Sequence, residues 1–153
     1  MSSLELRVPP PAVAVAVAIL MWLAAQIFPA LEFQLPAGGV LAVALAAIGV
    51  LMGSIAFVQF RRAGTTPDPR TPQDAAKLVV SGVYRFSRNP MYLGDLLILA
   101  GWTLWLANAL AFVGPPLFIA YIDRFQIAPE ERILAARFGA AYAEYCRAVR
   151  RWL

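Results

Sequence analysis

Two residue types that are common in soluble active sites are missing or nearly missing from this chain: histidine is absent, and Cys146 is the single cysteine. Without histidine, the chain cannot build a Ser-His-Asp triad, a histidine general base or a histidine-ligated zinc site. A single cysteine cannot form an internal disulfide, and on a helix face it behaves as a small apolar residue. We therefore expect no metal site and no chemistry that depends on histidine.

Charged residues are also scarce: they make up 14% of the 153 residues, whereas apolar residues make up 61%. Soluble domains carry about 25% charged and about 45–50% apolar residues. The Gly-x-Gly-x-x-Gly pattern of soluble nucleotide-binding folds is missing too. The composition therefore predicts a membrane protein, and the length predicts a single domain over residues 1–153.

Four apolar runs predict an all-α integral membrane protein with four transmembrane helices. The runs cover residues 12–31, 36–60, 91–107 and 109–122. Only Asn108 separates the last two, and the whole stretch is too long for one crossing, so we expect a helical hairpin that turns there. Pro115 and Pro116 are expected to bend or break the fourth span.

The basic residues favour one orientation in the membrane. All 13 lie at Arg7, in segment 61–88 or in segment 124–151, and none lies in the connection 31–35 or at Asn108. By the positive-inside rule, both termini are then cytoplasmic in a multi-pass protein of the cell inner membrane. A net charge of +4 placed in this way suits anionic lipid headgroups, and we expect no nucleic-acid partner.

Residues 61–90 and 124–153 form the two long cytoplasmic segments under this topology. In the second, Pro129 suits the first turn of a helix, and apolar residues then recur with a period near 3.6. This pattern predicts an amphipathic C-terminal helix, with either the membrane surface or the core of a site under its apolar face.

The polar segment 82–94 opens directly into the third predicted span. Asn89 and Pro90 have the form of a helix start, with asparagine as the N-cap and proline at the first position. The positive end of the helix dipole, together with Arg85 and Arg88, suits an anionic group such as a carboxylate or a phosphate. The alternative is that both arginines contact lipid headgroups while Asn-Pro only starts the span.

Three further groups of polar residues each have a functional and a structural interpretation. Glu130 and Glu131 either bind a ribose or a cationic centre, or they offset the dipole of the helix they begin. Tyr84 and Tyr92 either flank an adenine or a sulfonium, or they belong to an interfacial aromatic belt. Asp95 lies about one turn inside the membrane, where an ionisable group has a partner, has a function or snorkels.

The motif at residues 82–94 reads Gly-x-Tyr-x-x-x-Arg-Asn-Pro-x-Tyr-x-Gly, and Glu-Glu and Phe-Gly-x-x-Tyr-x-x-Tyr follow it at 130–131 and 138–145. This combination resembles the isoprenylcysteine carboxyl methyltransferase and phospholipid methyltransferase families of integral-membrane enzymes. The resemblance covers residues 63–153 and includes Gly-Thr-Thr-Pro at residues 64–67. It implies that S-adenosyl-L-methionine binds at the cytoplasmic face, between the loop before the third span and the start of the C-terminal helix.

The resemblance also implies which residues contact the cofactor, once they are carried over by position. They fall in the stretch before the motif, in the motif itself and at the later pair of glutamates. These residues are Lys77, Leu78, Val79, Tyr84, Arg88, Asn89, Pro90, Met91, Tyr92, Gly94, Glu130 and Glu131.

Two positions depart from the family pattern. Asn89 replaces the histidine of the eukaryotic members, although an amide can still donate to a carboxylate. Gln126 stands where the family has a substrate-contacting arginine, and the nearest replacement is Arg124 at the end of the fourth span. We therefore expect Arg124 to position an anionic, lipophilic or lipid-linked methyl acceptor.

The sequence thus predicts an S-adenosylmethionine-dependent methyltransferase that acts on a lipophilic acceptor, similar to an isoprenylcysteine carboxyl O-methyltransferase. Methyl transfer from a sulfonium needs alignment and exclusion of water more than acid–base catalysis, which suits a site without histidine. Phospholipid N-methylation and small-thiol S-methylation remain alternatives. A non-catalytic membrane scaffold is the alternative from a different class, and it would predict more polar residues deep within the spans.

Overall fold

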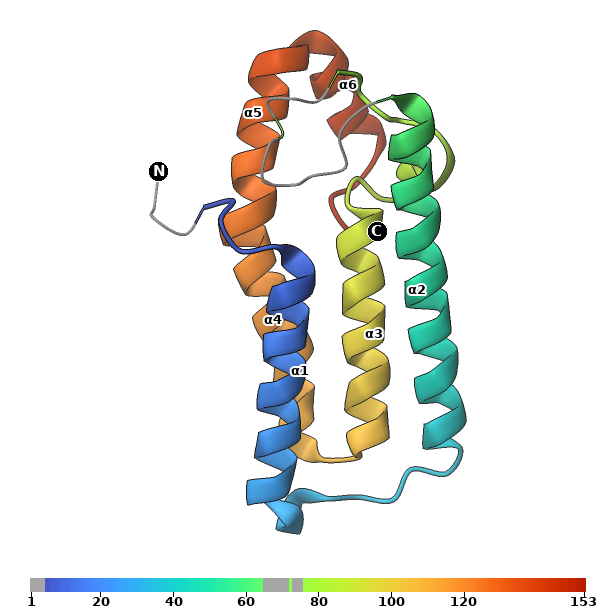
Figure 1. Ribbon diagram of the computed structural model, residues 1–153, viewed down its shortest axis with the longest axis vertical. Helices are drawn as coiled ribbons and strands as arrows, with labels where there is room; N and C mark the ends of the chain where they lie inside the picture. Colours follow the sequence, from blue (N-terminus) through green and yellow to red (C-terminus); the bar gives the residue numbers. More distant parts are fainter. Residues whose placement is uncertain (1–4, 65–71, 73–75) are drawn as a thin grey trace.

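The computed structural model describes residues 5–64, 72 and 76–153, and these form a bundle of α-helices (Figure 1). In these ranges the extended structure is confined to an isolated bridge between Glu32 and Asn108. The helical elements are, in chain order, α1 (Pro10–Ile27), the 3-10 turn η1 (Pro29–Leu31), α2 (Gly38–Ala63), the 3-10 turn η3 (Gly82–Arg85), α3 (Pro90–Leu106), the 3-10 turn η4 (Ala109–Val113), α4 (Gly114–Ile122), the π-helical turn η5 (Asp123–Ile127), α5 (Ala128–Phe138) and α6 (Ala140–Ala148).

Helix α3 lies between α1 and α2, and α4 packs against both α1 and α3 (Figure 1). The main hydrophobic core fills the space between α1, α3 and α4, where Val17, Leu99 and Phe118 are buried. A second cluster, at the end of the bundle near α6, contains Tyr84 and Tyr145. The fold therefore has one core along the helices and a second one beside the polar segments.

Helices α2 and α3 approach each other so closely that their backbones touch. A Cβ atom added to Gly94 would lie 2.7 Å from the carbonyl oxygen of Gly49, and one added to Gly101 would lie 2.6 Å from that of Ala42. Small residues are what allow such contact between helices in a membrane. The two helices therefore form a tightly fitted pair.

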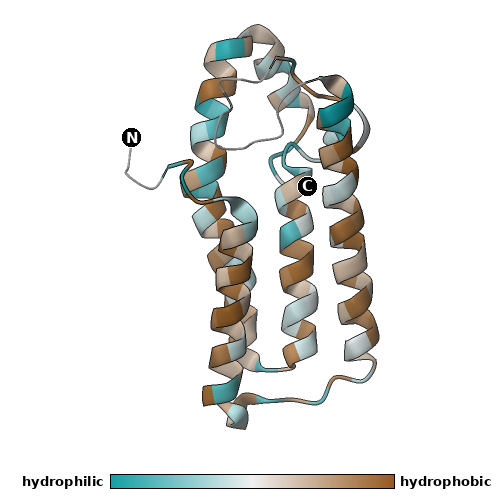
Figure 2. Ribbon diagram, in the orientation of Figure 1, coloured by the Kyte–Doolittle hydropathy of each residue, from teal (hydrophilic) through white to brown (hydrophobic). Residues whose placement is uncertain are grey.

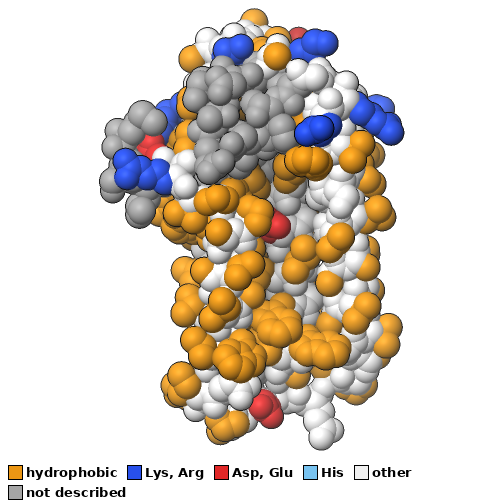
Figure 3. Space-filling view, in the orientation of Figure 1, with side chains coloured by type: hydrophobic (Ala, Val, Ile, Leu, Met, Phe, Trp, Pro, Cys, Tyr) orange, Lys and Arg blue, Asp and Glu red, His pale blue; other side chains and the backbone are white. Residues whose placement is uncertain are grey.

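The outer faces of α1 and α2 are hydrophobic and exposed (Figures 2 and 3). Both helices are long and apolar enough to cross a bilayer, and α3, with 17 residues, is a shorter apolar helix. Exposed apolar surface of this extent fits contact with lipid. Hydrophilic residues gather at the end of the bundle that holds α5 and α6 (Figure 2).

The ends of the first two helices differ from the predicted runs at residues 12–31 and 36–60. Helix α1 stops at Ile27, because Phe28 precedes a proline and adopts a non-helical conformation, with φ −121° and ψ 62°. Helix α2 continues past the two arginines to Ala63, where Gly64 ends it in the left-handed region at φ 68°.

The start of α3 corrects the predicted role of Asn89. Asn89 occupies the N-cap position and Pro90 the first turn, but the Asn89 side chain makes no capping hydrogen bond. Instead, the hydroxyl of Ser87 accepts a hydrogen bond from the Asn89 backbone N–H at 3.1 Å. The asparagine amide is therefore available for a contact elsewhere.

The segment after Asn108 is divided immediately before the two prolines, where η4 ends and α4 begins. Pro115 and Pro116 lie in the first turn of α4, where the missing N–H groups cost nothing. The predicted run 109–122 begins instead with the separate turn η4, and the Asn108 side chain caps it by accepting from the N–H of Leu110.

Pro129 lies in the first turn of α5, as predicted, but α5 does not begin as a separate helix. Helix α4 continues without a break through η5 into α5, and Gly139, at φ 52°, then separates α5 from α6. Pro129 has no N–H for the carbonyl of Phe125, four residues earlier. The backbone N–H of Leu6 donates to this carbonyl at 3.0 Å. The N-terminal segment thereby satisfies an acceptor that the proline leaves open.

Candidate functional site

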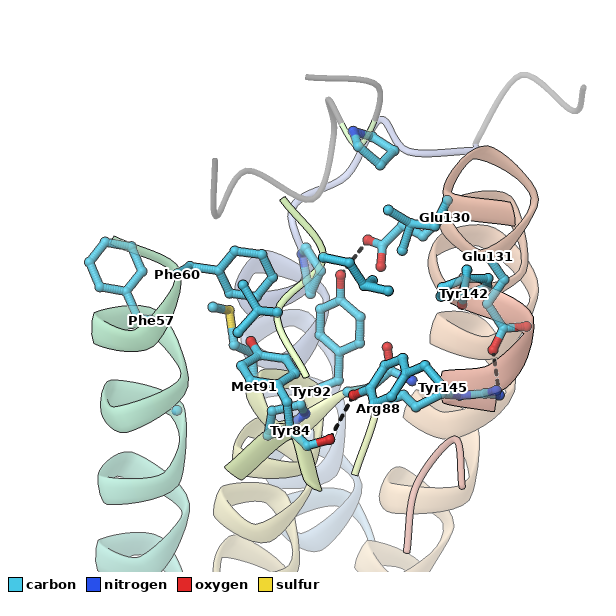
Figure 4. A pocket seen from close by; sticks show the side chains of 18 of the residues that line it. Phe57, Phe60, Tyr84, Arg88, Met91, Tyr92, Glu130, Glu131, Tyr142 and Tyr145 are labelled. Carbon is cyan, nitrogen blue, oxygen red and sulfur yellow. Dashed lines mark hydrogen bonds and ion pairs between the residues drawn. The ribbon is translucent and has the colours of Figure 1, made fainter. Parts of the chain in front are cut away.

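A cavity of about 390 Å³ lies at the end of the bundle where α3 begins (Figure 4). Its walls come from the starts of α1 and α3, the end of α2, the segment before α3, and α5 and α6. The residues that line it are Pro10, Pro11, Gly53, Phe57, Phe60, Pro72, Lys77, Leu78, Val79, Tyr84, Arg88, Asn89, Pro90, Met91, Tyr92, Asp95, Glu130, Glu131, Leu134, Tyr142 and Tyr145.

Glu130 places a half-buried carboxylate in this cavity. The hydroxyl of Tyr92, 38 residues away in the sequence, donates to Glu130 Oε1. The amide of Gln126, one turn earlier in the same continuous helix, donates to the same oxygen at 2.6 Å. Burial raises the pKa of Glu130 to about 7, although the two hydrogen bonds oppose the shift. The two hydrogen bonds thus hold the carboxylate in a fixed orientation.

Glu131 has a different environment, because two arginines bind it. Arg88 Nη2 lies 2.8 Å from Glu131 Oε1, and Arg151 Nη2 lies 2.6 Å from Glu131 Oε2. These charge-assisted contacts join the segment before α3, α5 and the C-terminal residues. In Figure 4, Arg88 and Glu131 lie below Glu130, on the side of the cavity toward Tyr145.

Arg88 has one hydrogen-bond donor left over. Its Nε atom is buried and has no hydrogen-bond partner among the described residues. A buried donor without a partner is costly, so the position suits an anionic ligand group in the cavity.

The C-terminal residues complete this side of the site. The side-chain amide of Asn89 donates to the carbonyl of Arg151 at 2.9 Å, and the hydroxyl of Ser87 donates to the same carbonyl at 3.3 Å. The backbone N–H of Arg88 donates to the carbonyl of Arg150 at 3.0 Å. The Asn89 side chain, which does not cap α3, therefore holds the end of the chain against the start of that helix.

Aromatic side chains form another part of the cavity wall. Tyr84 is buried, and the ring of Phe60 in α2 meets it edge-on at 5.1 Å between centroids. The hydroxyl of Tyr145 in α6 donates to the Tyr84 carbonyl at 2.7 Å. Burial raises the pKa of both tyrosines above their usual range, so they are neutral at physiological pH. Such a wall suits a flat or cationic ligand group.

The structure brings almost all of the predicted cofactor-contacting residues to one cavity. They come from segments that are far apart in the sequence and that meet only in the folded chain. The residues that line it are Lys77, Leu78, Val79, Tyr84, Arg88, Asn89, Pro90, Met91, Tyr92, Glu130 and Glu131.

Two predicted site residues do not line the cavity. Gly94 is buried against α2, where its lack of a side chain permits the contact with Gly49. Arg124 is exposed, and its guanidinium lies over the ring of Phe125 at 5.9 Å from the centroid. The expected role of Arg124 in positioning an acceptor therefore has no support from the cavity. Residues 65–67 of the predicted motif lie outside the described residues.

Sequence reasoning missed several residues of the site. Phe57 and Phe60 sit in an apolar run, where no local signal separates cavity-lining residues from lipid-facing ones. Tyr142 and Tyr145 belong to the later motif, but their spacing alone did not assign them to this cavity. Arg151 belongs to no motif that the sequence analysis identified, and its pairing with Glu131 is visible only in the folded chain.

Comparisons with known proteins fit this geometry. The model of the family described as phospholipid methyltransferase matches residues 37–141. The chain is 33% identical over 102 residues to a rice (Oryza sativa) protein described as a probable protein-S-isoprenylcysteine O-methyltransferase, covering 67% of this chain and 53% of the rice protein. The chain thus spans about half the length of that relative.

Two other relatives match shorter parts. A protein of Haemophilus influenzae, described as uncharacterized, is 56% identical over 63 residues, which is 41% of this chain and all of that protein. A mouse (Mus musculus) delta(14)-sterol reductase is 32% identical over 76 residues, covering 48% of this chain and 18% of the reductase. No solved structure gave a significant match.

The family match includes most of the walls of the cavity, from the end of α2 to α5, and extends over more than half of the sequence. The described residues also include apolar helices of membrane-spanning length. The chain belongs to the phospholipid methyltransferase family, which points to a membrane methyltransferase of the isoprenylcysteine and phospholipid methyltransferase type.

Proposed function

We propose that the chain is an S-adenosylmethionine-dependent methyltransferase that acts on a lipophilic acceptor at the cytoplasmic face of the membrane. The observation that carries the proposal is the convergence of Tyr92 and Glu130, which places a half-buried carboxylate in a largely apolar and aromatic cavity. The family match supports the methyl-transfer chemistry.

The cavity has suitable groups for each part of the cofactor. The carboxylate of Glu130 can accept hydrogen bonds from ribose hydroxyls, and the unsatisfied Nε of Arg88 can donate to a carboxylate. The aromatic wall at Tyr84 can contact the adenine. When bound, the cofactor supplies an activated methyl group. The residues of the chain then have to align the acceptor and exclude water.

The acceptor would reach the cavity from the membrane side. Pro10 and Pro11 of α1 and Phe57 of α2 line the cavity beside α3, and the faces of α1 and α2 outside it are apolar and exposed. An acceptor with a hydrocarbon tail could therefore leave its tail in lipid while its head reaches the cofactor. The name of the rice relative, a probable protein-S-isoprenylcysteine O-methyltransferase, fits an acceptor of this kind.

The proposed topology has four spans, with α3 and α4 as a membrane hairpin and both termini in the cytoplasm. The bridge between Glu32 and Asn108 holds the α1–α2 connection beside the α3–η4 turn at the end of the bundle remote from the cavity (Figure 1). In a Cys146→Ser background, cysteines at Leu35 and Ala109 should react with a membrane-impermeant reagent outside intact cells. A cysteine at Gly64 should not, and the opposite pattern would contradict the orientation.

Cofactor binding tests the proposed function directly. Calorimetric titration of S-adenosylhomocysteine into the detergent-solubilised protein should show saturable binding without any acceptor, because all the proposed contacts come from the protein. Glu144→Gln, an exposed change on α6, serves as the matched control for a lost carboxylate and should bind like the unmodified protein. If the unmodified protein does not bind at millimolar ligand, the methyltransferase proposal is wrong.

A further inference from the structure

The chain before α1 lies against α5 and forms an ion pair with it (Figure 1). We call this segment, residues 5–9, the N-terminal strap. The Glu5 carboxylate accepts from Arg132 Nη2 at 2.8 Å, although 127 residues separate the two in the sequence. The Glu5 side chain is only 5% exposed, whereas that of Arg132 is 54% exposed. A charge buried to this extent is costly without a partner, so Arg132 is what allows the strap to stay in this position.

Two further contacts fix the strap. Val8 packs against the main hydrophobic core, and the Leu6 N–H donates to the Phe125 carbonyl in η5 at 3.0 Å. Leu6 adopts φ 59°, in the left-handed region that residues with a side chain rarely occupy. Such a conformation persists only where the surrounding structure imposes it, and it is found most often at functional sites. The strap is therefore a fixed part of the fold beside η5 and α5.

The strap leads directly into the wall of the cavity. Pro10 and Pro11 follow it, form the first turn of α1 and line the cavity. Proline fixes φ, so the run of three prolines that begins at Pro9 leaves little freedom between the strap and α1. At its other end the strap binds Arg132, two residues after Glu130. One short segment thus joins two walls of the cavity, the start of α1 and the start of α5.

Three consecutive side chains at the start of α5 have three different partners. Glu130 binds Tyr92 in α3, and Glu131 binds the arginines of the site. Arg132 binds the strap. Successive side chains on a helix point about 100° apart around its axis. A rotation of α5 that turned Glu130 away from the cavity would therefore have to break the contact between Arg132 and the strap.

We propose that the N-terminal strap positions Glu130 for the cofactor, with Glu5 as the positioning residue that acts through Arg132. This inference rests on the proposed function, because the affinity that the strap controls is the affinity for the cofactor. Neither Glu5 nor Arg132 lines the cavity, so both act through α5 and not on the ligand. They hold the Glu130 carboxylate in its orientation before the cofactor binds, and preorganisation of this kind raises affinity.

Calorimetric titration of S-adenosylhomocysteine into the full chain in detergent tests the proposal on Glu5→Gln, Arg132→Gln and the double variant. Arg132→Gln should lower the affinity about tenfold, because it leaves the buried Glu5 carboxylate without its cation and so releases the strap. Glu5→Gln should lower it about threefold, since the arginine that it releases is largely exposed to solvent. The double variant should recover to the level of Glu5→Gln. Arg7→Gln, an exposed change within the strap, is the matched control and should bind like the unmodified protein.

Each variant is also measured in a Glu130→Gln background, which separates positioning from a general effect on the fold. If the strap acts through the Glu130 carboxylate, Arg132→Gln should cause little further loss of affinity in that background. A general effect would instead add in full, because it does not depend on the carboxylate. If Arg132→Gln does not fold, Glu5→Gln, which removes the buried charge, serves for the same comparison.

Two binding results would overturn the inference. One is an affinity for S-adenosylhomocysteine that neither Glu5→Gln nor Arg132→Gln changes. The other is a loss that is equally large with and without the Glu130 carboxylate.

Hydrogen exchange of the α5 amides in the ligand-free protein tests the strap apart from the cofactor. Exchange should be faster in Arg132→Gln than in the unmodified protein, because the strap no longer holds α5, and equal rates would also overturn the inference. A protein that shows this faster exchange but never binds S-adenosylhomocysteine would refute the proposed function and leave the hold of the strap on α5 standing.

Discussion

The hydroxyl of Tyr92 donates to the carboxylate of Glu130 and so connects the first turn of α3 to α5. The same carboxylate oxygen accepts from Gln126, so its orientation is set by groups on two elements. Glu131, the next residue, is instead engaged by Arg88 and Arg151. Adjacent glutamates therefore have separate tasks: one faces the cavity and the other holds the cavity's walls together.

Substitution of the two glutamates should separate these tasks. Glu130→Gln should weaken S-adenosylhomocysteine binding by about 1.5–3 kcal/mol, the value of a hydrogen bond to a charged group, with little change in thermal stability. Glu131→Gln should lower the melting temperature, because it removes the ion pairs with Arg88 and Arg151 and leaves Arg151 only its contact with Asp123. Calorimetric binding and thermal unfolding, measured on both variants, check this. Equal loss of affinity in both would show that the division is wrong.

Lowering the pH should increase the contribution of Glu130 to stability and decrease the affinity for the cofactor. The pKa of Glu130 is raised from 4.5 to about 7 in the folded protein, so the folded state holds this proton more tightly than the unfolded chain does. Its contribution to the stability of the ligand-free protein is therefore full below pH 4.5 and is lost as the pH rises through about 7. Cofactor affinity should rise over the same interval, because the ionised carboxylate is the better acceptor.

The difference between the unmodified protein and Glu130→Gln isolates this effect from the other titrating groups. Melting temperatures and S-adenosylhomocysteine affinities should be measured from pH 5 to pH 8 for both proteins. A flat affinity profile in the unmodified protein would count against a direct contact between Glu130 and the ligand.

The C-terminal residues should contribute to stability and to cofactor affinity through their backbone as well as through the Arg151 side chain. Arg151→Ala removes the contact with Glu131, which is partly exposed to solvent and should contribute about 1 kcal/mol at most. Deletion of residues 151–153 also removes the carbonyl that accepts from Asn89 and Ser87, and the Trp152 side chain, which packs against the main core and donates to Asp123. We expect the deletion to lower both stability and cofactor affinity more than Arg151→Ala does, and Arg151→Lys to restore part of the loss.

Equal behaviour of the deletion and of Arg151→Ala would mean that neither the carbonyl contact nor Trp152 contributes. The experiment therefore compares melting temperature and S-adenosylhomocysteine affinity across the three variants in one detergent.

Glycines along α2 and α3 should differ in their tolerance of alanine. Gly94→Ala would place a methyl group against the Gly49 carbonyl, and we expect this overpacking to cost about 1–3 kcal/mol. Gly53→Ala is the matched control, because nothing lies within 4 Å of a Cβ atom added there. Thermal unfolding in detergent should show a lower melting temperature for Gly94→Ala and an unchanged one for Gly53→Ala.

The sequence predicted the helical class and the approximate place of each helix, because long apolar runs and the Asn-Pro start are local signals. It also predicted most of the cavity residues, since the motif at residues 82–94 and the Glu130–Glu131 pair mark two of its walls. It did not predict the role of Asn89, because a capping side chain and one that binds Arg151 have the same local sequence.

Other differences also arise from contacts between distant segments. The continuity of α4, η5 and α5 past Pro129 depends on the Leu6 N–H, which satisfies the carbonyl of Phe125. Arg124 lies in the π-helical turn η5, and the geometry of this turn decides whether its side chain faces the cavity. Neither can be obtained from periodicity, because the partners are set by the tertiary structure.

The backbone contact between α2 and α3 also limits which methyl acceptors variants of this protein could accommodate. Where Gly49 meets Gly94, outside the cavity, a side chain cannot be enlarged without separating two helices, so the spacing between α2 and α3 is fixed. Helix α1 has no comparable contact with α2 and meets the cavity through Pro10 and Pro11. Efforts to redirect the enzyme toward acceptors of other widths should therefore vary the start of α1, leaving the glycines of the fitted pair untouched.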